Sequence, residues 1–247
     1  INLVRRPDGG VSQRDLDLLM SCGEAISTVI LAQTLQNMEY PAVALTGAQA
    51  GIITDDHFGD ARIKEIKPDN ILANLKSGRI VIVAGFQGVT PEGEVTTLGR
   101  GGSDTTAAAL GVALHAEVVE VYTDVEGVMT ADPRIVSEAR TLTQVTYREV
   151  SEMALLGAKV IHPRAVEIAM EDRVPLKVKC TFSDAPGTLI WDSPSGGIEI
   201  RGDRTITGIA HIAGVAQVKV RSEENFNTGG QSLKVFRSLA EAGISLD

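Results

Sequence analysis

Residues 97–107, TLGRGGSDTTA, combine residue types that could bind both ends of an amino acid. The three glycines allow the backbone to approach a ligand closely, and an expected helix start behind them offers N–H groups and a partial positive charge. The guanidinium of Arg100 can hold a carboxylate through two hydrogen bonds, and the carboxylate of Asp104 suits an ammonium group. A glycine-rich turn before a helix, without any ligand, is the alternative explanation. We interpret the segment as a candidate amino-acid-binding loop.

Residues 121–134, VYTDVEGVMTADPR, form a second candidate binding segment. Ligands of parallel α/β sheets collect at the carboxyl ends of the strands, so Thr123, Asp124 and the backbone after them are candidates for holding a nucleotide, with Arg134 reaching its phosphates. A Ca²⁺ loop is a weaker alternative because the acidic residues lack the spacing of an EF-hand. Turn chemistry alone also accounts for Asp132 before Pro133.

Two further charged residues occupy positions that a ligand would explain. Lys159, in GAKVIHPR (residues 157–164), lies between two expected helices and could meet a phosphate as a point charge; a solvated surface lysine is the common alternative. Glu24 lies in an apolar stretch of helix, where a carboxylate is either exposed or paired with a cation such as a ligand ammonium or Arg100. We interpret His162 as a packing or capping residue rather than a base.

The elements that must position these residues alternate between helices and strands. Such alternation predicts βαβ units and a mainly parallel sheet. The expected helices cover residues 12–38 (with Ser12 as N-cap), 68–76, 103–114, 147–156 and 164–171. The expected strands cover residues 42–46, 79–84, 118–122 and 176–180. The β-branched runs at 79–84 and 118–122 are typical of strands buried on both faces. In the first helix, the expected apolar side carries Leu16, Leu19, Met20, Ile26, Val29, Ile30 and Leu35.

The composition of the 247 residues predicts two domains joined by a linker, and their net charge disfavours some classes of partner. Asp, Ser, Pro and Gly cluster near residues 191–204, which predicts a domain of residues 1–192, a linker of residues 193–204 and a partial second domain of residues 205–247. That second part should contain strands at 206–211 and 216–221 and a helix at 229–242. Lys plus Arg is 23 and Asp plus Glu is 32, so the net charge is 23 − 32 = −9. This charge disfavours nucleic-acid and anionic-membrane partners, which need clustered cations.

Short apolar runs and the absence of a signal-peptide pattern predict a cytoplasmic protein. Cys22 and Cys180 are expected to be buried free thiols. The chain starts without Met and stops where a further strand is expected, so we interpret it as part of a longer protein.

Several stretches together resemble the aspartokinases of the amino-acid kinase superfamily. They are LLMSCGEA (18–25), GAQAGI (47–52), AGFQGVTPEGEVTTLGRGGSDTTA (84–107), YTDVEGVMTADPRI (122–135) and GAKVIHPRAVE (157–167). The tail, with ITGIAHIAG and KVFRSLAEAGISLD, is similar to the start of an ACT regulatory domain. The resemblance implies an α/β fold: a three-layer αβα kinase domain with a mainly parallel sheet, followed by an incomplete ACT-like α+β piece.

The same resemblance implies an activity, the transfer of the γ-phosphoryl group of ATP, with Mg²⁺, to the side-chain carboxylate of L-aspartate. This is the first step toward lysine, threonine and methionine. Lys159 and Asp104 would be catalytic. The implied aspartate-binding residues are Glu24, Arg100, Gly101, Gly102, Ser103 and Asp104. The implied ATP-binding residues are Thr123, Asp124, Met129, Asp132, Arg134 and Lys159. No metal ligand is assigned to the protein. The attacking carboxylate is already ionised near neutral pH, so no general base is expected.

The resemblance also implies regulation and assembly. A feedback effector (lysine, threonine or diaminopimelate) would bind at ACT domains, which would also join chains into a homodimer or higher oligomer. A KxGGTS-like phosphate-binding segment typical of aspartokinases does not occur in these 247 residues, which predicts little or no activity for them alone. The alternatives are a kinase for glutamate, acetylglutamate or carbamate, and an inactive or regulatory amino-acid-binding chain.

Overall fold

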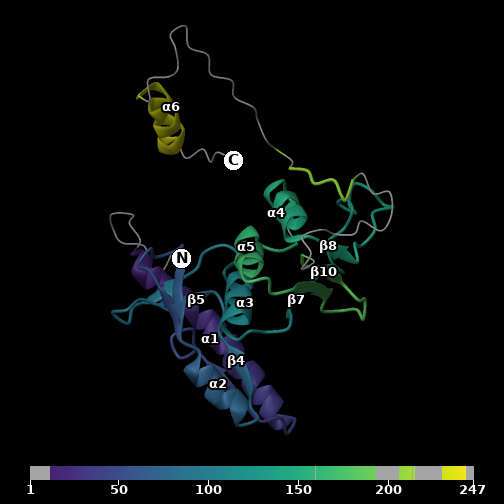
Figure 1. The fold of residues 1–247 in the computed structure, drawn as a ribbon. Helices are drawn as coiled ribbons and strands as arrows, with labels where there is room; N and C mark the ends of the chain where they lie inside the picture. The colour runs from purple at the N-terminus through teal and green to yellow at the C-terminus, as the bar shows by residue number, and fades with distance from the viewer. Residues whose placement is uncertain (1–11, 159, 193–205, 213, 215–229, 243–247) are drawn as a thin grey trace. The chain divides into compact units, whose positions relative to one another are not determined.

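The computed structural model describes residues 12–158, 160–192, 206–212, 214 and 230–242 (Figure 1). The chain separates into two compact units, Ile1–His211 and Ile212–Asp247. In the second unit the described element is helix α6, Gly230–Glu241, which confirms the helix expected at 229–242. The strand expected at 216–221 lies outside the described residues. All other described elements belong to the first unit, which also carries the candidate site.

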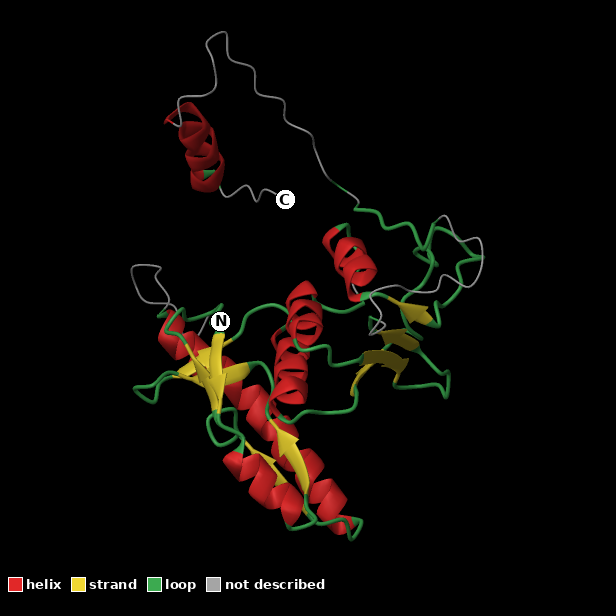
Figure 2. Ribbon diagram, in the orientation of Figure 1, coloured by secondary structure: helices red, strands yellow, loops and turns green. Residues whose placement is uncertain are grey.

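The described residues of the first unit form three hydrogen-bonded sheets, whose strands Figure 2 shows in yellow. A parallel pair joins β1 (Ala42–Leu45) to β4 (Ile80–Val83). The second sheet has the order β3-β2-β5-β6, with bounds Ile63–Ile66, Ile52–Thr54, Gln87–Val89 and Val95–Thr97. The third has the order β7-β9-β10-β8, with bounds Val119–Thr123, Leu176–Cys180, Thr188–Ile190 and Gln144–Val145. Four of the seven strand pairings are parallel, which agrees with the expected α/β class.

Helix α1, Gln13–Asn37, is the longest element and begins as predicted at its N-cap Ser12, whose hydroxyl accepts a hydrogen bond from the Asp15 amide. It packs against β1, β4 and β6, and α2 (Asp69–Lys76) packs on the same strand β4 (Figure 1). Its length and hydropathy meet the criteria for a membrane span, as do those of many core helices; its contacts with three strands show that it is part of the globular fold.

The prediction for the packed side of α1 was wrong. Its buried residues are Asp17, Ser21, Thr28 and Ala32, whereas the expected apolar residues Leu19, Met20, Ile26, Val29 and Ile30 are exposed, Ile26 by 61%. Asp17 can be buried because Gly59 and Thr97 donate hydrogen bonds to its carboxylate, and Ser21 because its hydroxyl donates to the Leu18 carbonyl within α1. Apolarity alone therefore did not identify the packed face. Cys22 is also exposed, contrary to expectation, whereas Cys180 is a buried free thiol as predicted.

Helices α3 (Gly102–Ala113), α4 (Tyr147–Leu155) and α5 (Pro163–Glu171) cover the third sheet. Helix α3 packs on α5 and β7, and α4 packs on α5. Their shared core includes the fully buried side chains of Tyr147, Val166, Leu176 and Val178. A smaller core around Leu45, Ala50, Ile52 and Ile71 supports the β1–β4 side.

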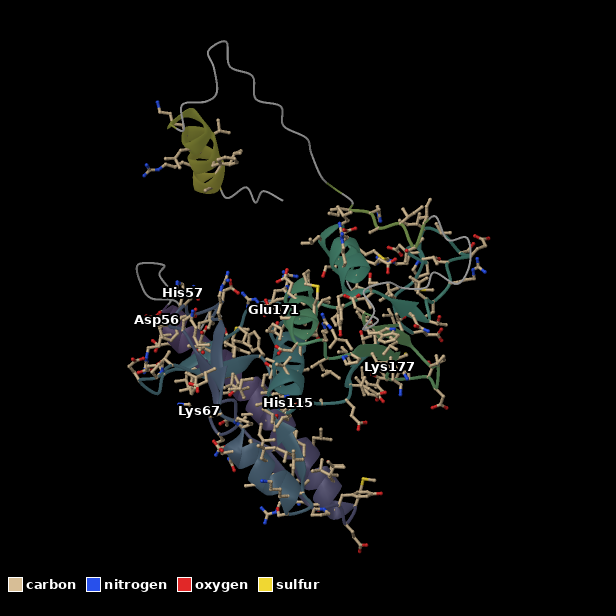
Figure 3. The ribbon with its side chains drawn as sticks, viewed as in Figure 1. Asp56, His57, Lys67, His115, Glu171 and Lys177 are labelled. Carbon is tan, nitrogen blue, oxygen red and sulfur yellow. The ribbon has the colours of Figure 1, made fainter. Side chains whose placement is uncertain are left out.

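Two strands are less buried than their sequences predicted. Ile80 at the start of β4 is 42% exposed, and β7 alternates between partly buried and exposed residues instead of being covered on both faces. The solvent face of the third sheet carries polar side chains such as Lys177 on β9 (Figure 3). The segment 206–211, expected as a strand, forms none; it is held to the rest of the first unit by a hydrogen bond from the Ile209 amide to the Thr130 carbonyl.

Candidate active site

The glycine-rich loop connects β6 to α3, as its sequence predicted. Gly99 and Gly101 adopt left-handed backbone angles, φ +70° and φ +68°, and Gly101 is the N-cap of α3. A Cβ on Gly101 would lie 2.1 Å from Cγ of His162, and one on Gly99 would lie 2.8 Å from Oδ1 of Asp60. Both positions therefore require glycine, for backbone angle and for space.

A hollow of about 290 Å³ lies against this loop and joins it to α1. It is lined by Met20, Glu24, Phe86, Gly99, Gly101, Gly102, Ser103 and Asp104. The structure thus brings Glu24 from α1 together with four of the other predicted substrate-binding residues. Two carboxylates and the amino end of a helix converge on one small space. Such a space could hold an ammonium group on one side and an anionic group on the other.

Arg100 is the predicted substrate residue that does not line the hollow. It lies on the same loop, but its side chain is exposed and forms no ion pair with any other residue in the described ranges. Its guanidinium is therefore available to a ligand only if the side chain turns toward the hollow.

Asp104 connects the glycine-rich loop to the segment GAKVIHPR. Its Oδ2 accepts a hydrogen bond of 3.2 Å from the backbone amide of His162, the N-cap residue of α5. The His162 ring packs directly on Gly101, so the predicted packing role of His162 is confirmed. Its Nδ1 is buried without a partner in the described part of the chain. Lys159, three residues earlier, lies outside the described residues.

Phe86 belongs to the site although the sequence reasoning did not select it. It is a non-glycine residue with φ +67°, its amide donates to the Thr106 hydroxyl at 3.0 Å, and its carbonyl accepts from the Leu98 amide at 2.9 Å. Residues held in this strained region often occur at functional sites. The available signal was the GFQG sequence after an expected strand, in which an aromatic residue follows a glycine. Met20 was likewise expected only as a packing residue.

A second hollow of about 440 Å³ continues from the first along α1, β4 and α3. Glu24 and Ser103 line both hollows, so the two are adjacent at these residues. The second hollow is mostly apolar, with Leu31, Val81 and Leu110 among its lining residues.

The predicted nucleotide residues follow β7, whose last residue Thr123 pairs with Cys180 at the end of the parallel strand β9. The Thr123 hydroxyl donates to the Asp124 carboxylate at 3.1 Å. Met129 forms an isolated bridge with Thr141. The carboxyl end of two parallel strands is the expected place for a nucleotide.

Arg134 is paired with Asp132 rather than being free, through two side-chain hydrogen bonds of 2.7 and 3.0 Å. The hydrogen bonds from the Arg134 side chain, together with that from its backbone amide, lower the pKa of the Asp132 carboxyl to about 2. The guanidinium remains largely exposed, so it can still meet a phosphate on its outer side. No cluster of three or more metal-binding side chains occurs among the residues that the structure describes.

The profile of the Amino acid kinase family matches residues 2–180, and the chain belongs to this family. It is 48% identical over its full length to aspartokinase 1 of Bacillus subtilis and 44% identical to an aspartokinase of Geobacillus stearothermophilus, of which it covers 61% and 59%. The chain thus spans about three fifths of the length of these relatives.

Solved structures show the same likeness. E. coli aspartokinase III in complex with aspartate and ADP in the R-state superposes with a TM-score of 0.74 at 32% identity, covering 96% of this chain and 53% of that one. Aspartate kinase from Synechocystis gives a TM-score of 0.67 at 43% identity, covering 80% and 32%. UMP kinase from Ureaplasma parvum, at 17% identity and a TM-score of 0.54, shares the fold alone.

Proposed function

We propose that the protein containing this chain is an aspartokinase, which phosphorylates the side-chain carboxylate of L-aspartate with ATP. The observation that carries the proposal is the hollow in which Glu24 and Asp104 meet the glycine-rich start of α3. The similarity to aspartokinases along the entire chain supports the same substrate. A cytoplasmic location fits a kinase that consumes ATP and an amino acid.

Each group around the hollow has a role in this proposal. The carboxylates of Glu24 and Asp104 attract the ammonium group of aspartate, while Arg100 turns inward to bind its α-carboxylate through two hydrogen bonds. The Gly102 amide donates to the Gly99 carbonyl, whereas the next amides of the first turn of α3, those of Ser103 and Asp104, are available to an anionic oxygen. Because the attacking carboxylate is already ionised, the protein needs no base for this step.

Catalysis would therefore consist of positioning and of charge neutralisation. Holding the carboxylate in line with the γ-phosphate removes most of the entropic barrier. Mg²⁺ arriving with ATP, the loop amides and Lys159 would offset the charge on the transferred group. The nucleotide would be held at and after the end of β7, by Thr123, Asp124, Met129, Asp132 and Arg134. Asp104 accepts a hydrogen bond from the amide of His162, three residues after Lys159, and this contact supports a role for both segments in one site.

We further propose that the whole protein is feedback-regulated and oligomeric through ACT domains. An effector such as lysine, threonine or diaminopimelate would bind there. In support, E. coli aspartokinase III has been solved in a T-state in complex with lysine and aspartate. Activity of the full-length protein that does not change on adding lysine, threonine or diaminopimelate would refute this regulation.

The substrate assignment can be tested with Arg100→Ala in the full-length protein. We expect KM for aspartate to rise about tenfold or more, because a hydrogen bond to a charged group contributes about 1.5–3 kcal/mol. KM for ATP should change little. Arg148→Ala, which removes an exposed arginine on α4, is the matched control and should leave both values unchanged. A rise confined to KM for ATP would show that the loop binds the nucleotide instead of the amino acid.

A further inference from the structure

Asp17 is a buried carboxylate in the first turns of α1, only 2% exposed, which the proposed chemistry does not use. Its Oδ2 accepts hydrogen bonds from the amides of Thr97 at 2.7 Å and Gly59 at 2.9 Å, and its Oδ1 accepts one from the Thr97 hydroxyl at 3.0 Å. A buried carboxylate is costly unless it is bonded in this way. Asp17 therefore ties α1 both to the end of β6 and to the segment before β3.

The residues that Asp17 holds lead directly into the glycine-rich loop. Thr97 is the last residue of β6, Leu98 follows it, and Gly99 begins the loop. The Thr97 carbonyl accepts from the Ala61 amide, the Leu98 amide donates to Phe86, and the Leu98 carbonyl accepts from the Arg164 guanidinium. All four backbone polar groups of Thr97 and Leu98 are thus bonded, and the Thr97 amide is the one bonded by Asp17. The loop therefore starts from a rigid position.

Gly59 and Asp60, in the segment before β3 that Asp17 bonds, lie against the same loop. The Gly59 carbonyl and the Asp60 carboxylate both lie within about 3 Å of where a Cβ of Gly99 would be. The neighbouring residues Asp56 and His57 lie near the start of α1 in Figure 3. Asp17, by bonding Gly59, thus supports the loop from a second side.

The other end of this connection is Glu24. Asp17, Ser21 and Glu24 are spaced by four and three residues, so they follow one face of α1. The Ser21 carbonyl accepts a hydrogen bond from the buried Gln87 side chain at 3.0 Å, and Glu24 lines both hollows. The bonds from Asp17 to β6 therefore fix the rotation of α1 about its axis and its position along that axis, and so fix where Glu24 lies relative to the loop.

We propose that Asp17 is a positioning residue for the amino-acid site, which sets the separation between Glu24 on α1 and the loop of Gly99–Asp104. This inference rests on the proposed function, since it assumes that the hollow binds the amino acid. It predicts that loss of Asp17 weakens aspartate binding although Asp17 touches no substrate. Small displacements of binding groups have large effects on reaction rates, about 10²-fold for about 1 Å.

Two substitutions separate hydrogen bonding from charge. In Asp17→Asn the amide oxygen can accept the bonds from Thr97 and Gly59, and its NH₂ can donate to the Thr97 hydroxyl, which is able to act as an acceptor. Asp17→Ala leaves all three donors without a partner. Ser21→Ala is the matched control, because the Ser21 hydroxyl bonds only within α1, to the Leu18 carbonyl at 2.8 Å.

The experiment measures KM for aspartate, KM for ATP and amide hydrogen exchange of residues 97–103 in the full-length protein and these three variants. We expect Asp17→Ala to raise KM for aspartate about tenfold or more, to leave KM for ATP within about twofold, and to speed exchange in the loop. Asp17→Asn and Ser21→Ala should stay close to wild type in all three measurements. If Asp17→Ala does not fold, Thr97→Val, which removes only the hydroxyl donor to Asp17, should give a smaller rise in KM for aspartate and a smaller increase in loop exchange.

The outcomes are distinguishable. An Asp17→Ala protein that is less stable but has unchanged KM values and loop exchange would overturn the inference, since Asp17 would then be merely structural. In the case where Asp17→Ala does not fold, wild-type KM for aspartate and wild-type loop exchange in Thr97→Val would overturn it equally. Wild-type protein that does not use aspartate would overturn the proposed function instead, and hydrogen exchange would still decide whether Asp17 holds the loop.

Discussion

Replacing Gly101 with alanine should destabilise the protein far more than the same change at another glycine with the same backbone angle. Gly101 has φ +68°, and a Cβ there would lie 2.1–2.4 Å from three atoms of the His162 side chain. The backbone angle alone costs an alanine about 1–2 kcal/mol. Moving the packed ring adds about 1–3 kcal/mol. Gly101→Ala should therefore lower the free energy of unfolding by about 2–5 kcal/mol.

Gly78→Ala is the matched control for this prediction. Gly78 has φ +76° but no atom within 4 Å of its Cβ position, so it should show only the backbone cost of about 1–2 kcal/mol. Urea unfolding followed by circular dichroism measures both variants. His162→Ala in the Gly101→Ala background should recover the difference between them. Equal destabilisation by Gly101→Ala and Gly78→Ala would refute the packing of His162 on the loop.

Three further perturbations test other parts of the structure. Arg134→Met should raise the pKa of Asp132 from about 2 toward 3.8 in a carboxyl NMR titration. Because the pKa of Asp132 is lowered in the folded protein, the stability from this pair is present above about pH 4 and is lost as the pH falls toward 2. An unchanged pKa would contradict the pairing. Arg164→Met should lower the free energy of unfolding by about 1–3 kcal/mol because it leaves the Leu98 carbonyl, just before the loop, without its donor. The control Arg148→Met should lower it by under about 0.5 kcal/mol. Equal losses in urea unfolding would argue against a role for Arg164 in holding the start of the loop. Thr188→Val should cost about 1–3 kcal/mol, since its buried hydroxyl joins two backbone groups, and a neutral result in thermal unfolding would show that neither bond matters.

Elements with strong local signals were predictable from the sequence. The start of α1 at Ser12 and strand β9 at Leu176–Cys180 agree with expectation, because a cap residue and an alternation of apolar and polar residues act locally. The glycine-rich loop was likewise found from its residue types. By contrast, β5 and β6 are three-residue strands that owe their existence to pairing with each other, which no short apolar pattern reveals.

Residues whose importance depends on distant partners were not predictable. Asp17 looks like an exposed acidic residue of an amphipathic helix until Thr97, 80 residues away, is seen to bond it. The apolar pattern of α1 indicated the opposite face, because a few satisfied polar groups are buried there instead. Phe86 was missed because its place beside the loop goes with a backbone angle of φ +67°, which the identity of the residue does not indicate.

The central claim is that the protein phosphorylates aspartate, and trapping the acyl phosphate with hydroxylamine tests it most directly. The full-length protein, ATP and Mg²⁺ would be incubated with aspartate or with glutamate as the control substrate. The account predicts aspartyl hydroxamate that depends on both ATP and aspartate, with little product from glutamate and a large loss in Arg100→Ala. Hydroxamate formed equally from glutamate, or none from either amino acid, would contradict the account.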